Sequence, residues 1–63
     1  MDARLVKLIL ASQWKDIRER INGAAASDNQ FEIVLLRREE KALFNTIEGL
    51  GFEQSEILKL ITN

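Results

Sequence analysis

Apolar residues recur every three to four positions along two long stretches of the chain, and glycines interrupt the pattern between them. In the first stretch, about residues 3–22, the repeating apolar positions are Ala3, Val6, Leu10, Trp14, Ile17 and Ile21. At about 100° per residue they gather on one side of an α-helix, the side that a packed helix buries. The pattern predicts a helix that ends near Asn22-Gly23, because glycine readily closes a helix in the left-handed conformation.

The second stretch, about residues 28–48, repeats the helical pattern after the connection GAAASDN. Its apolar positions are Ile33, Leu36, Leu43, Phe44 and Ile47. Ser27 and Gln30 have the spacing of a capping box, in which each side chain satisfies a free backbone N–H group of the other. A short third helix is predicted at about residues 53–62, where EQSEILKLI keeps the same period.

The stretch GLGF, residues 49–52, stands between the second and third segments. The surrounding residues LFNTIEGLGFEQSEILKLI (43–61) resemble the first two helices of a ubiquitin-associated domain, with Gly51 and Phe52 at the family's Gly-Phe pair. That resemblance implies ubiquitin binding, and the family's fold needs a third helix after Lys59–Ile61, where this sequence has only two more residues. We therefore interpret the stretch as a corner: a glycine closes one helix and Phe52 packs back at the entry of the next.

A strand interpretation competes with helix at two places. Residues 31–36, FEIVLL, have the length and composition of a strand, and residues 4–10 could pair with them in a small α+β fold. Against this, a two-stranded sheet is marginal in water, and the helical period runs from Leu36 to Leu43 without a break. The prediction is an all-α antiparallel helical hairpin with a short third helix, in a single domain over residues 1–63.

Both long segments carry apolar residues outside the face that a hairpin would bury. They are Leu5 and Ile9 in the first segment, and Phe31, Val34 and Leu35 in the second. A chain of 63 residues has a small core, and the absence of cysteine and histidine removes disulfides and the usual zinc ligands. Self-association is the remaining way to stabilise so small a fold. These five residues are predicted to form the interface of a homodimer or of a contact with a partner protein.

A second surface is basic. Arg4, Lys7, Lys15 and Arg18 fall on one side of the first predicted helix, with Ala11 between them; we refer to these five residues as the basic stripe. Cations in line can follow a phosphate backbone, so nucleic-acid binding is the alternative function. The net charge of −1 supplies no overall attraction to nucleic acid, and a solvated helix face is the simpler interpretation of the basic stripe.

Two residues within the apolar faces stand out. Trp14 has the spacing of a core residue. Glu40 falls between Leu36 and Leu43, where a carboxylate needs a partner. In a hairpin folded about Ala25, Glu40 lies near Leu10, so we expect it to pair with Lys7 or to fix register across a dimer as a buried polar residue.

Nothing in the sequence predicts catalysis, because no histidine, nucleophile or second carboxylate is expected beside Glu40. No cofactor, metal or small-molecule substrate is expected either. No apolar run reaches the length of a membrane span, and the start lacks the features of a signal peptide, so a cytoplasmic location is expected. The prediction is a non-enzymatic regulator that acts by protein–protein contact as a homodimer. The initial methionine favours a complete gene product over an excised domain.

Overall fold

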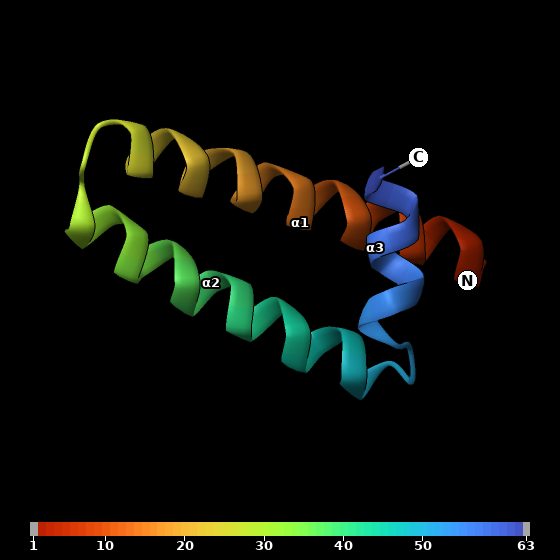
Figure 1. Ribbon diagram of the computed structural model, residues 1–63. Coiled ribbons are helices and arrows are strands. Elements are labelled where there is room, and N and C mark those ends of the chain that lie inside the picture. The colour runs from red at the N-terminus through yellow and green to blue at the C-terminus, as the bar shows by residue number, and fades with distance from the viewer. Residues whose placement is uncertain (1, 63) are drawn as a thin grey trace.

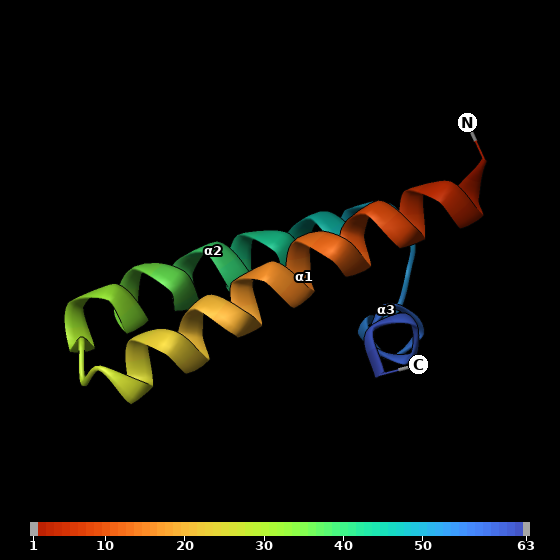
Figure 2. The same cartoon turned by 90° about the horizontal axis from the view of Figure 1, so that it is seen from above.

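The computed structural model describes residues 2–62 and forms three helices: α1 (Ala3–Ala26), α2 (Gln30–Gly49) and α3 (Gln54–Thr62). α1 and α2 form an antiparallel hairpin, and α3 crosses α1 near its N-terminal end (Figure 1). Seen from above, α3 lies on one side of the layer that α1 and α2 make (Figure 2). α1 packs extensively against both other helices, whereas α2 and α3 touch only slightly. The predicted all-α hairpin with a short third helix is confirmed. Residues 4–10 and 31–36 are helical, so the α+β alternative is wrong.

The core runs along the hairpin and ends where α3 joins it. Its buried apolar residues are Leu10, Ala11, Trp14, Ile17, Ile21, Ala24, Leu36, Leu43, Ile47 and Ile57. Ile47 of α2 and Ile57 of α3 are both 0% exposed, which places the most enclosed part of the core under α3. The Trp14 ring meets Phe44 edge to face, with centroids 5.0 Å apart, as aromatic pairs prefer. The core assignment of Trp14 is confirmed.

α1 is one turn longer than its sequence predicts, and Gly23 lies inside it rather than at its end. The helix continues through Ala24–Ala26, since alanine is the strongest helix former and Ala24 is buried in the core. It closes with a Schellman motif in which the Asn29 N–H donates to the Ala24 carbonyl (2.8 Å). Asp28 takes the left-handed position (φ 54°), which aspartate tolerates better than most residues.

The predicted Ser27–Gln30 capping box is wrong because Ser27 belongs to the end of α1. Its hydroxyl donates to the Gly23 carbonyl at 2.8 Å. The N-cap of α2 is Asn29, whose side-chain oxygen accepts from the Glu32 N–H at 3.1 Å. Asparagine is a preferred N-cap, so the start of α2 moves to Gln30.

The corner prediction for residues 49–52 is confirmed. Gly51 has a φ of 85°, its N–H donates to the Glu48 carbonyl (3.0 Å), and the Phe52 N–H donates to the Ile47 carbonyl (3.1 Å). This is a Schellman motif with glycine at its left-handed position. Phe52 is half-buried against the core next to Ile47, as the motif's apolar contact requires.

Two glycine-to-alanine substitutions have opposite expected effects. Gly23→Ala lies inside α1 with open space around it, so we expect a gain in stability of about 0.5–1 kcal/mol. Gly51→Ala also meets no neighbour, but its positive φ makes a side chain unfavourable, and we expect a loss of about 1 kcal/mol or more. Urea unfolding followed by circular dichroism measures both. Equal effects would contradict the assigned positions of these glycines.

Candidate interaction surfaces

The side of the hairpin opposite α3 is uncovered, and a shallow cleft of about 380 Å³ runs between α1 and α2 there. Ile17 and Leu43 contribute its apolar lining, and Gln13, Asp16, Glu39, Ala42 and Thr46 complete it. None of the residues that line it comes from α3. By helical spacing, Ile9 of α1 and Leu35 of α2 point to the same side. We refer to this surface, from Ile9 across the cleft to Leu35, as the open face.

The five predicted interface residues are all exposed, and they lie at opposite ends of a molecule about 39 Å long. Leu5 and Ile9 are near the start of α1, whereas Phe31, Val34 and Leu35 are near the start of α2, at the loop end (Figure 1). Helical spacing puts Leu5 and Phe31 at the edges of the open face and Val34 on the outer side of α2. One chain does not bring the two groups together. Their role as an interface stays a prediction.

Four further large apolar residues are exposed and were not predicted: Leu8, Leu50, Leu58 and Leu60. Leu8 and Leu60 lie together, since both line a cleft of about 330 Å³ with Ala11, Ser12, Lys15 and Ile61. The signal was present in the sequence, because Leu8 falls outside the face that α1 presents to α2. The sequence does not show in which direction α3 docks, so it could not predict that Leu8 meets Leu60.

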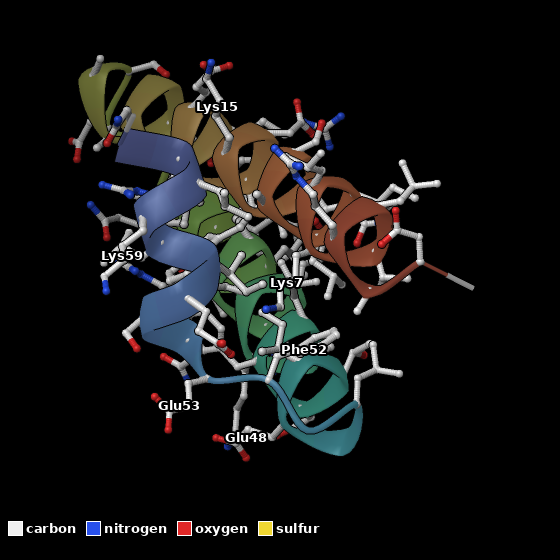
Figure 3. All side chains as sticks on the ribbon, turned by 90° about the vertical axis from the view of Figure 1, so that its right-hand side faces the viewer. Lys7, Lys15, Glu48, Phe52, Glu53 and Lys59 are labelled. Atoms are coloured by element: carbon white, nitrogen blue, oxygen red, sulfur yellow. The ribbon has the colours of Figure 1, made fainter. Side chains whose placement is uncertain are left out.

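The basic stripe is not a free surface, because α3 packs across it. Ala11, in the middle of the stripe, is 5% exposed, while Lys15 and Arg18 are exposed. Lys7 Nζ lies 3.4 Å from Glu56 Oε1 and 5.2 Å from the centroid of the Phe52 ring. Figure 3 shows Lys7 between α1 and α3, directed toward Phe52, with Lys15 farther along α1. α3 thus separates Arg4 and Lys7 from the other two cations.

Within residues 2–62, no exposed aromatic ring lies beside the basic stripe for nucleic-acid bases to stack on. Of the four aromatic residues, Trp14 is buried, Phe44 and Phe52 are half-buried in the core, and Phe31 lies at the loop end. Base stacking on exposed aromatic rings supplies much of the affinity of proteins for single-stranded nucleic acid. Nucleic-acid binding by Arg4, Lys7, Lys15 and Arg18 stays a prediction.

Glu40 has a different partner from the one expected. Its side chain is 14% exposed and accepts from Trp14 Nε1 (3.3 Å) and from Arg37 (3.1 Å). The expected pairing with Lys7 is wrong, because α1 runs on to Ala26 and the hairpin turns about residues 27–28 instead of Ala25. That change shifts the pairing along α1 by about one turn, from Leu10 to Trp14. A role of Glu40 in dimer register stays a prediction.

Glu56 connects α3 to α1 at the N-terminal end of α3. One carboxylate oxygen accepts from the Glu53 N–H (2.9 Å), and the other accepts from Lys7 (3.4 Å). The pKa of Glu56 lies below its ordinary value of 4.5, and the largest cause is the hydrogen bond from the Glu53 N–H. The hydrogen bond from Lys7 and the positive charges of Lys7 and Lys59 lower the pKa further. The folded chain therefore favours the ionised form of Glu56, first through the cap at the start of α3 and then through the contact with Lys7 of α1.

Within residues 2–62, no three acidic side chains come close enough together to hold a metal ion. None of the helices in that range combines the length and the apolarity that crossing a membrane requires.

Removing the Glu40 carboxylate should cost stability because it leaves the Trp14 indole N–H without its acceptor. We expect Glu40→Ala to lose about 1–2 kcal/mol of unfolding free energy. Glu40→Gln should lose less, since the amide oxygen can still accept from the indole. Urea unfolding followed by Trp14 fluorescence measures both variants, and equal losses would show that the indole hydrogen bond contributes nothing.

The pKa of Glu56 predicts a pH dependence. Because the folded-state value is lowered, the stabilisation by Glu56 is present above about pH 4.5 and is lost as the pH falls through the lower folded value. We expect Glu56→Gln to melt below the wild type at pH 7, and the difference to shrink toward pH 3. Thermal unfolding at several pH values tests this. A constant difference across that range would rule out the ionised side chain as its source.

A comparison with protein-family models finds no match, and comparisons with curated proteins and with solved structures find none either.

Proposed function

We propose that this protein is a small non-enzymatic regulator that acts by protein–protein contact, and that two copies pair through the open face. The observation that supports this most directly is the exposure of large apolar side chains at both ends of that face. Phe31 is 74% exposed, and helical spacing directs the exposed Ile9 and Leu35 to the side of the cleft that the third helix leaves uncovered. Exposed apolar patches on so small a chain are typical of interaction surfaces.

A two-fold axis across the hairpin would satisfy both apolar groups at once. With the two chains antiparallel, Leu5 and Ile9 of each copy would meet Phe31 and Leu35 of the other, in an isologous contact. In such a pair, each apolar group would contact the other group of the second copy at the opposite end of the 39 Å axis, so that neither group would stay exposed.

The middle of the open face suits close approach. Ala42 is small, and Gln13 and Thr46 are uncharged; of the two carboxylates that line the cleft, Asp16 is paired with Arg20 at 3.2 Å and Glu39 is exposed. A standard interface buries about 800 Å² on each partner. The total accessible surface of the chain is 4653 Å², and one side of a molecule with principal extents of 39 by 23 Å can supply an area of that order.

The double variant Leu5→Gln with Ile9→Gln should weaken self-association by at least about tenfold, because it places polar groups in the apolar contact. Helicity should hardly change, since both side chains are exposed in the monomer. Sedimentation equilibrium over a wide concentration range measures the association, and circular dichroism measures the helicity.

Leu8→Gln is the matched control, because Leu8 is as exposed as Ile9 (48% and 49%) but lies toward α3. It should leave the association constant unchanged. A wild-type chain that stays monomeric at high concentration, or a double variant that associates like the wild type, would rule out pairing through the open face.

A further inference from the structure

A second concave surface lies between the N-terminal half of α1 and α3, on the side away from the open face. It consists of two neighbouring clefts of about 380 and 330 Å³ that share Leu60. We refer to it as the α1–α3 groove; its exposed residues include Arg4, Leu8, Lys15, Lys59 and Leu60, and Lys7 within it is half-buried. The open face and its predicted residues do not contribute to it.

The charge of the α1–α3 groove is opposite to that of the rest of the molecule. Four of the nine cationic residues line it, but only one of the ten acidic residues, Glu56, does. That carboxylate already accepts from Lys7 and from the Glu53 N–H. The remaining surface is therefore net acidic. An acidic partner would be attracted to this groove and repelled elsewhere.

The centre of the groove is apolar. Leu8 is 48% and Leu60 is 41% exposed, and Ala11 beneath them leaves the backbones of α1 and α3 close together. Cations border these leucines at both ends, with Arg4 and Lys59 on one side and Lys15 on the other. An apolar centre between charged ends is the arrangement that receives the apolar face of an amphipathic helix.

We propose that the α1–α3 groove binds an acidic amphipathic α-helix of a partner protein. The partner's apolar side chains would cover Leu8 and Leu60, and its carboxylates would face Arg4, Lys15 and Lys59. This inference rests on the proposed function in protein–protein contact and names the class of partner, but it uses a different surface from self-association.

The same features favour a protein over nucleic acid or lipid as the occupant. A phosphate backbone would leave the two central leucines uncovered, and no exposed aromatic ring lies beside them for a base to stack on. An anionic bilayer would meet a chain whose net charge is −1 and whose surface outside the groove is acidic.

The probe is a fluorescently labelled synthetic peptide of about 16 residues, with leucine at i, i+3, i+4 and i+7 and glutamate at the flanking positions. A matched peptide has lysine in place of every glutamate. In fluorescence anisotropy titrations we expect the acidic peptide to bind at least about tenfold more tightly than the lysine peptide, and less tightly as salt rises. Equal binding of the two peptides, or no binding of the acidic one, would overturn the proposal.

Two variant pairs locate the binding. Leu8→Gln should weaken acidic-peptide binding about tenfold, while Ile9→Gln, its neighbour of equal exposure on the open face, should not. Arg4→Glu should also weaken binding, while Arg38→Glu on α2 should not. Peptide binding that responds to Ile9 or Arg38 as strongly as to Leu8 or Arg4 would contradict the assignment to the groove.

Sedimentation of the same variants separates the two proposals. If Leu8→Gln loses peptide binding and sediments like the wild type, the groove assignment stands whether or not the wild type self-associates. Titrations with duplex DNA and with vesicles that contain phosphatidylserine complete the test. If DNA or the vesicles bind more tightly than the acidic peptide, and Arg4→Glu abolishes that binding, the groove serves nucleic acid or membrane instead.

Discussion

The burial of α1 on two adjacent sides is the constraint on which the rest of the structure depends. Leu10 and Ala11 are consecutive, and both are 5% exposed, because α2 covers the first and α3 covers the second. A hairpin alone would bury only one side of each helix and would give a very small core. The alanine lets α3 cross close to the α1 backbone, so that Ile57 reaches Ile47 in the most enclosed part of the core. The covered and uncovered sides of the hairpin follow from this crossing.

The same crossing explains what the sequence could and could not predict. Helical periodicity identified three helices, the hairpin and the corner at Gly51, because each depends on local pattern and on turn chemistry. The end of α1 was missed since Gly23 carries a termination signal that the three following alanines override. A change of one turn at that point was enough to give Glu40 the wrong partner. A small error in the position of the turn changes every predicted contact between the two helices of a hairpin, because the residues that face each other are found by counting outward from the turn.

The candidate surfaces depend even more on tertiary structure than the helices do. Ala11 in a row of cations does not by itself predict where α3 docks, because an alanine in such a row is equally typical of a solvated helix. Only the position of α3 shows that Lys7 is held by Glu56 and Phe52, and that Leu8 meets Leu60. Exposure of Leu5, Ile9, Phe31 and Leu35 was predicted because these positions fall outside the face that α1 and α2 share, and they stay exposed because α3 covers the other side of α1.

The two proposed surfaces lie on different sides of α1, and this has a consequence for how they would work together. Pairing through the open face would cover Ile9 and leave Leu8, one residue earlier, directed to the outside. Each dimer would then carry two α1–α3 grooves facing away from each other. If the partner has one acidic helix, each dimer would bind two partner molecules and bring them together. A single partner with two acidic helices on a long linker would gain avidity, since its second helix would bind at a raised effective concentration. Self-association would thus set the number of partners, and the groove would select them.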